Sequence, residues 1–341
     1  MKLKRVLTLL LFLSLSPWLR AYEPMGPLRT KNYYVPFLPF YSFPGEGAAA
    51  GEKGALNLSL AQYYIQDMVT EFHSISTGYL KERFVDYEGY ILEPSLSFNP
   101  LDNLEAGITT RLHFYYGGIF DSVFEGFHDF FGFPNGGRES FPRDEVFINI
   151  RTLSGIDLVL DTNLTALGDT DFFVKWTFLD SIPVDLALWG ALKFPTGSME
   201  RISGSGYADL GFALLADFLI SERFALYLET GLVIPGQLFT AALAPLPVFH
   251  LMAGTEFLAT ENFSLLLQFK LNTSPIGDTV TIPENISYTV KLDLPMTNLI
   301  FGFMWKAGTL DFQFSLEEDA FTNNGADLIA NLTVSTSFDL Y

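Results

Sequence analysis

Residues 263–272, "FSLLLQFKLN", decide the fold class of this chain. Apolar side chains occupy every second position, and polar side chains occupy most of the positions between them. The apolar set is Phe263, Leu265, Leu267, Phe269 and Leu271. The polar set is Ser264, Gln268, Lys270 and Asn272. A period of two indicates a β-strand whose two faces meet different environments.

The same alternation recurs along most of the chain, for example in 285–294 ("NISYTVKLDL") and 309–318 ("TLDFQFSLEE"). Further strands are predicted at 55–66, 84–98, 104–116, 145–153, 155–162, 168–179, 183–194, 207–219, 223–234, 248–259, 298–306 and 326–340. Most of these segments are longer than the five or six residues typical of soluble sheets, and they match the roughly nine to eleven residues of a tilted strand that crosses a bilayer.

A sheet in lipid must close on itself, because lipid offers no hydrogen bonds to the backbone of an open edge. We therefore predict an all-β fold, a closed antiparallel transmembrane β-barrel, with a soluble β-sandwich as the alternative. Short connections such as 180–183 and 260–262 alternate with long ones such as 195–206 and 235–247. This rhythm is typical of outer-membrane barrels, which carry their long loops outside. The segments number fifteen, and an even number is needed for both ends to lie on one side, so we expect about 14 strands within a range of 12–16.

The first 21 residues have the organisation of a secretory signal peptide. Lys2, Lys4 and Arg5 precede an apolar run at 6–15, which is too short to span a bilayer. We expect cleavage after Ala21 and export to the bacterial outer membrane, where 55–341 forms the barrel; an uncleaved anchor is the alternative. No later stretch predicts a membrane-spanning helix, and the absence of cysteine leaves neither a lipid-attachment site nor a disulfide.

Residues 22–54 differ from the rest in containing five prolines among large aromatic residues. Proline cannot serve a central strand, and the alternation of prolines with rings makes a stiff, extended segment. Two interpretations remain open for this segment: a plug folded into the barrel lumen, or a strap packed on the periplasmic side.

The charge of the chain limits its partners. The net charge is −19, and residues 1–21 carry four basic residues and no acidic one, so the mature chain has about −23. This excess of acid argues against nucleic acid as a partner. Outer-membrane lipids, the barrel-assembly machinery and a small solute are the partners we expect, and we expect no cofactor.

The 117–144 loop concentrates the candidate binding residues. Its apolar residues fall at helical spacing over 117–131 before "PNGG" ends the pattern, which predicts one short amphipathic helix in an extracellular loop. Asp121, Glu125 and His128 are candidate ligands for a divalent cation, and the mouth residues Arg138 and Arg143 for a phosphate or carboxylate. A helix that only constricts the barrel, with a wet charged face, is the alternative.

The polar faces of the strands supply possible ligand contacts in the lumen. The residues in question are Arg111, His113, Lys175 and Lys193. The sequence contains neither a G-x-S-x-G nor an H-E-x-x-H motif, so we predict no catalytic residue and no enzyme activity.

Three blocks of the sequence resemble successive parts of a bacterial family of unknown function made of outer-membrane barrels. They are "GPLRTKNYYVPFLPFY" (26–41), "GGIFDSVFEGFHDFFGFPNGGRESFPRD" (117–144) and "KFPTGSMERISGSGYADLGFALLAD" (193–217). The chain is also similar to porins and hydrophobic-solute transporters of the phenol-degradation type. The resemblance implies the fold and the location, and it brings no substrate and no catalytic residue.

Three functions follow as hypotheses. The first is an outer-membrane channel or transporter for small or hydrophobic solutes, with selectivity set by the charged lumen and the 117–144 constriction. The second is a non-conducting structural or surface-binding barrel whose loops bind cations or lipopolysaccharide. The third, an outer-membrane lipid hydrolase, is the least favoured because it lacks a motif.

Overall fold

The computed structural model describes residues 23–35, 37–74, 80–117, 126, 145–151, 157–236, 245–275, 294–319 and 325–340. The strands are β1 (Ala55–Ser74), β2 (Leu80–Leu101), β3 (Leu104–Thr109), β4 (Leu112–Tyr116), β5 (Phe147–Arg151), β6 (Asp157–Leu160), β7 (Leu164–Leu167), β8 (Thr170–Ser181), β9 (Val184–Phe194), β10 (Asp209–Ser221), β11 (Phe224–Ile234), β12 (Val248–Thr260), β13 (Phe263–Asn272), β14 (Met296–Ala307), β15 (Leu310–Asp319) and β16 (Leu328–Asp339). Among these elements the only helical one is a 3-10 turn, η2 (Met199–Arg201).

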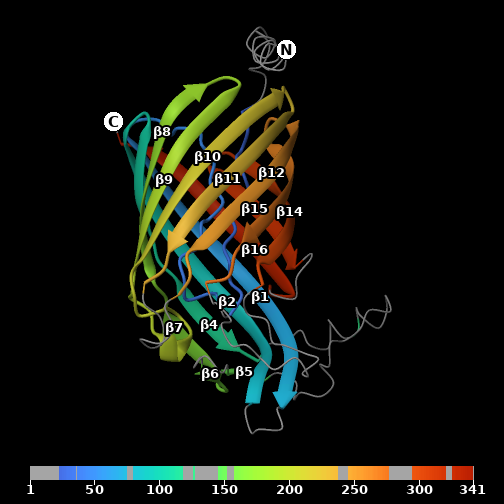
Figure 1. Cartoon of the computed structure of the whole chain (residues 1–341). Helices are drawn as coiled ribbons and strands as arrows, with labels where there is room; N and C mark the ends of the chain where they lie inside the picture. Colours follow the sequence, from blue (N-terminus) through green and yellow to red (C-terminus); the bar gives the residue numbers. More distant parts are fainter. Residues whose placement is uncertain are drawn as a thin grey trace, which may run out of the picture.

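Twelve strands form one closed antiparallel ring, in the order β1-β16-β15-β14-β13-β12-β11-β10-β9-β8-β3-β2, and β2 returns to β1. Figure 1 shows this barrel from the side. The closed barrel fold is therefore confirmed, and the preferred count of 14 strands was too high. The predicted segments 145–153 and 155–162 became the short strands β5 and β6, which lie outside the ring. The predicted strand 285–294 and the predicted helix of the 117–144 loop lie outside the described residues.

The alternation of side chains sorts the two faces of the wall as the sequence indicates. Along β8, Asp171, Phe173 and Lys175 are buried, whereas Phe172 and Val174 between them are exposed. Exposed apolar residues also lie on the outside of β9, β10, β11 and β13, and the outward-facing rings pair near the short turns, as Phe224 with Phe257 and Trp305 with Phe312 do. An apolar outer face with aromatic rings near its rim is what lipid contact requires. No described helix is long and apolar enough to cross a bilayer.

The two ends of the barrel differ. At one end short turns join β8 to β9, β10 to β11, β12 to β13 and β14 to β15. The last described residue lies at the same end, where Leu340 N donates to Gly54 O at 3.1 Å. Long connections, such as 195–208 and 273–295, leave from the opposite end. We call these the short-turn end and the long-loop end.

At the long-loop end β1 and β2 extend beyond the ring as a paired ribbon (Figure 1). β3, β4 and β5 pair in succession along the outer edge of β2, and β7 and β6 pair with β4 and β5. The predicted strand 104–116 is therefore broken into β3 and β4, which flank Thr110 and Arg111. A hydrophobic core forms on the inner side of this extension from residues including Tyr63, Tyr87 and Ile148.

Candidate functional site

Residues 23–54, the N-terminal segment, run inside the barrel (Figure 1). Met25 N donates to Glu256 on β12 near the short-turn end, and the chain then advances to a turn in which Leu38 N donates to Tyr34 O at 2.8 Å. The returning arm pairs with the advancing one where Thr30 N donates to Pro44 O at 2.7 Å. The tip of this hairpin packs into the hydrophobic core of the long-loop end.

The inner wall holds the backbone of this segment through side chains. Four carboxylates of β10, β11 and β12 accept hydrogen bonds from its N–H groups: Asp209 from Tyr41, Asp217 from Ala48 and Ala49, Glu229 from Glu46, and Glu256 from Met25. Two glutamines each bond one residue twice. Gln313 Oε1 accepts from Arg29 N at 2.9 Å while its Nε2 donates to Arg29 O at 2.9 Å, and Gln268 bonds Leu28 N and O in the same way.

Lys31 belongs to a buried network of four charged side chains, with Arg111, Glu93 and Asp171. Its Nζ lies 3.0 Å from Glu93 Oε2 and 3.0 Å from Asp171 Oδ2, and Arg111 bonds the same two carboxylates. Two cations balance two carboxylates, as charges out of water require. The Tyr33 hydroxyl donates to Glu93 Oε2 at 3.0 Å. Burial, together with the negative charge of Glu93, raises the pKa of Tyr33 well above its usual value, so the hydroxyl keeps the proton that it donates.

Lys193 makes a second buried contact with the segment. Its Nζ lies 2.7 Å from Asp169 Oδ2 and 3.0 Å from Asp209 Oδ2, and it donates to Pro39 O at 2.5 Å. Lys175 pairs with Glu105 at 3.1 Å and reaches Gly47 O at 3.4 Å. Both lysines were predicted as ligand contacts, and both contact the chain's own N-terminal segment.

His113 is placed differently. It is buried on β4, and neither ring nitrogen has a hydrogen-bond partner among the described residues. All four predicted lumen residues are buried, but only Lys175 and Lys193 lie on strands of the ring, whereas His113 lies on β4 outside it and Arg111 directly precedes β4. Arg111 and the two lysines bind the segment or its network.

Two aromatic rings of the segment lie on glycines of the wall. A Cβ at Gly211 would lie 2.5 Å from the Tyr41 ring, and a Cβ at Gly231 would lie 2.6 Å from the Phe43 ring. Trp189 Nε1 donates to the Tyr41 hydroxyl at 3.0 Å. The wall is therefore shaped for these two rings, since any other residue at either glycine would displace them.

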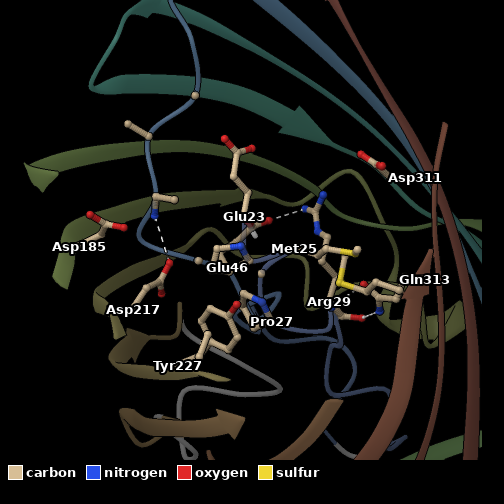
Figure 2. A pocket seen from close by; sticks show the side chains of 18 of the residues that line it. Glu23, Met25, Pro27, Arg29, Glu46, Asp185, Asp217, Tyr227, Asp311 and Gln313 are labelled. Atoms are coloured by element: carbon tan, nitrogen blue, oxygen red, sulfur yellow. Dashed lines mark hydrogen bonds and ion pairs between the residues drawn. The ribbon is translucent and has the colours of Figure 1, made fainter. Parts of the chain in front are cut away.

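A cavity of about 960 Å³ opens beside the segment at the short-turn end. Figure 2 shows Met25, Pro27 and Arg29 on one side of it, with Asp185 and Asp217 facing them from the wall. Seven carboxylates line this cavity against three cationic side chains. Arg29 and Glu46, both from the segment, form an ion pair of 2.8 Å across its inner end.

The predicted mouth site falls on 117–144. Asp121, Glu125, His128, Arg138 and Arg143 lie outside the described residues, so the cation and phosphate hypotheses stay predictions. Among the residues that the structure describes, no group of three or more His, Asp or Glu side chains is arranged to hold a metal ion.

Residues 4–337 match the model of a family described as a protein of unknown function, DUF3187. The chain belongs to this family. The resemblance predicted from the three sequence blocks is thereby confirmed, and the family assignment covers both the N-terminal segment and the barrel. No curated protein sequence matches the chain.

Among solved structures, this DUF3187 chain is similar to the COG4313 outer membrane channel from Pseudomonas putida F1. The TM-score is 0.54 at 12% identity, over 85% of this chain and 98% of that one. The NanC porin matches with a TM-score of 0.44 at 7% identity, over 83% and 100% of the two chains. The toluene transporter TodX of P. putida matches with a TM-score of 0.39 at 9% identity, over 84% and 90%. The first likeness shows the fold, which is that of outer-membrane β-barrel channels.

Sequence reasoning did not single out the glutamines and carboxylates that hold the backbone of the segment. Gln268 belongs to the polar face of the opening stretch, but nothing marks it apart from Ser264 or Asn272 beside it. The available signal was the composition of the inward strand faces. Many strands carry an inward glutamine or carboxylate, and the oxygens of these side chains need hydrogen-bond donors from another part of the chain.

Proposed function

We propose that this chain is an outer-membrane channel or transporter for small or hydrophobic solutes, with residues 23–54 as a plug that occupies its path. The supporting observation is that the interior is filled by a separate segment that polar wall residues hold, rather than by wall side chains alone. A barrel of about eight strands fills itself with side chains, whereas a wider one has room for a channel or a plug. Twelve strands leave that room here.

The connectivity of the plug favours withdrawal at the short-turn end. The plug begins at Glu23 near this end, and its other end continues into β1 at Ala55. The cavity of about 960 Å³ opens at the same mouth. In an outer membrane this mouth would face the periplasm, since the long loops lie outside. The 117–144 loop is proposed to constrict the opposite mouth.

Single-channel recording of the refolded chain in planar bilayers tests this proposal. We expect little conductance from the intact chain and sustained conductance after deletion of 23–49, with folding of both proteins checked by heat-dependent gel mobility. A variant that lacks only residues 118–144 is recorded in the same way. A folded barrel that lacks both segments and stays electrically silent would contradict a channel.

A non-conducting structural barrel is the second candidate. It is favoured by the extent of burial, since the tip of the segment joins a hydrophobic core at the long-loop end. The same recordings decide between the two candidates, because a structural barrel has no reason to conduct when its N-terminal segment is displaced.

A further inference from the structure

The inner wall of β12, β13, β15 and β16 recognises a peptide backbone. Gln268 and Gln313 each offer one acceptor and one donor, and these match the N–H and C=O of two consecutive residues, Leu28 and Arg29. Asn331 Nδ2 donates a second bond to Arg29 O at 2.7 Å. Such contacts read the main chain and are independent of the side chains that it carries.

The two glutamine side chains make no other hydrogen bonds in the described structure. Gln268 bonds nothing but Leu28, and Gln313 nothing but Arg29, among the described residues. The wall also makes room for the first of them, since a Cβ at Gly254 on β12 would lie 2.8 Å from the Gln268 side chain. Without a peptide, both buried amides would lose every protein partner described for them.

Side-chain sockets flank the backbone contacts. Leu28 is fully buried against Leu266 and Ile300, with Met304 beside them. Three residues on, Lys31 lies between two carboxylates, and Lys270 Nζ donates to its carbonyl at 3.2 Å. This wall, together with Glu93 on β2 and Asp171 on β8, thus selects an apolar residue followed, three positions later, by a cation.

We propose that this wall is a binding site for extended peptides, with residues 25–31 of the chain as the resident ligand. The ligand class is an extended oligopeptide with an apolar side chain three residues before a cationic one. The site is reached from the cavity at the short-turn end, which residues 23–27 and Arg29 line (Figure 2). The proposal deepens the proposed function, on which it rests for passage of the peptide but not for its binding.

The test uses the full chain with a protease site inserted between Ala49 and Ala50, at the exposed edge of the cavity. After folding and cleavage, fragment 23–49 is held without a covalent bond. A fluorescent synthetic peptide of residues 23–49 is added, binding is measured by anisotropy, and release of the resident fragment is measured by mass spectrometry. Uncleaved protein is the control, because its tethered segment competes at an effective concentration near millimolar.

We expect saturable exchange in the cleaved protein only. A peptide with Lys31→Glu should bind at least about tenfold more weakly, as should a peptide of permuted order. On the wall, Gln268→Leu and Gln313→Leu should each weaken binding by about tenfold, since each removes two hydrogen bonds. Gln62→Leu is the matched control, because Gln62 bonds Tyr90 on β2 and should leave binding unchanged.

Three results would overturn the peptide site. They are a resident fragment that no excess of peptide displaces, a permuted peptide that binds as tightly as the native order, and glutamine variants on the wall that behave like Gln62→Leu. Conductance of the same cleaved protein separates this proposal from the channel. Conduction without peptide exchange removes only the peptide site, and exchange without conduction removes only the channel.

Discussion

Replacing Lys31 by methionine should release the N-terminal segment. The substitution keeps much of the side-chain volume and removes one of the two cations from the network with Glu93, Asp171 and Arg111. Each of the four side chains is at most 8% exposed, so solvent cannot screen the charge that is left over. Breaking a buried ion pair costs about 3–5 kcal/mol. Arg111 still faces both carboxylates, which places the cost near the lower limit, about 3 kcal/mol.

At about 1.4 kcal/mol per tenfold change, this cost raises the population with a displaced segment by roughly 150-fold. The chain has no cysteine, so a single reporter can be introduced at Thr30, which is 2% exposed. The rate at which a maleimide modifies Thr30→Cys in folded protein then reports displacement. Because the reporter is present in every variant, its own cost cancels. Lys53→Met, at an exposed lysine of the same segment, is the matched control and should leave the rate unchanged.

A second substitution checks the electrostatic cause. Lys31→Met combined with Asp171→Asn leaves Arg111 and Glu93 as a neutral pair, so the double variant should recover about 2 kcal/mol of the loss. Labelling of the double variant as fast as that of Lys31→Met would show that lost packing, and not charge, is responsible. A labelling rate of Lys31→Met within about threefold of the parent would refute the claim that this network holds the segment.

Three further outcomes are expected. Gly231→Val should speed labelling in the same assay by about 5- to 150-fold, because its side chain overlaps the Phe43 ring and overpacking costs about 1–3 kcal/mol. Trp189→Phe should act in the same direction by only about fivefold, since it removes one hydrogen bond to Tyr41. Leu214→Arg, on the outward face midway along β10, should destabilise the barrel by about 2–4 kcal/mol in phospholipid vesicles, measured by urea unfolding; an unaffected variant would argue against lipid contact there.

The sequence predicted the strands of the ring because alternation is a local property. Segment 263–272 became β13 with its predicted bounds and its polar side chains facing inward. The preferred count of 14 strands was too high for a related reason, although twelve lies within the predicted range. Segments 145–153 and 155–162 also alternate, but alternation reports two different faces and does not reveal the partner strand. β5 pairs with the outer edge of the β2 extension, and β6 pairs with β5 alone among the described strands.

The position of the N-terminal segment could not be chosen from its own residues. Its prolines and rings fit a plug and a strap equally well, because both must bury rings without joining a sheet. The deciding contacts join residues far apart in the chain, such as Leu28 with Gln268 across 240 positions and Tyr41 with Asp209 across 168. No local pattern specifies which acceptor of a polar strand face will meet which backbone donor.

The acidity of the chain takes on a different meaning once these contacts are known. From composition alone, the excess of carboxylates argued against nucleic acid as a partner. Inside the barrel, however, Asp209, Asp217, Glu229 and Glu256 all accept hydrogen bonds from backbone N–H groups of the segment. Carboxylates have no hydrogen to donate while ionised, so whatever replaces the segment must bring donors or positive charge. An anionic solute brings no positive charge and is repelled by these carboxylates, so the opened lumen should exclude anions more strongly than neutral solutes with several N–H or O–H groups.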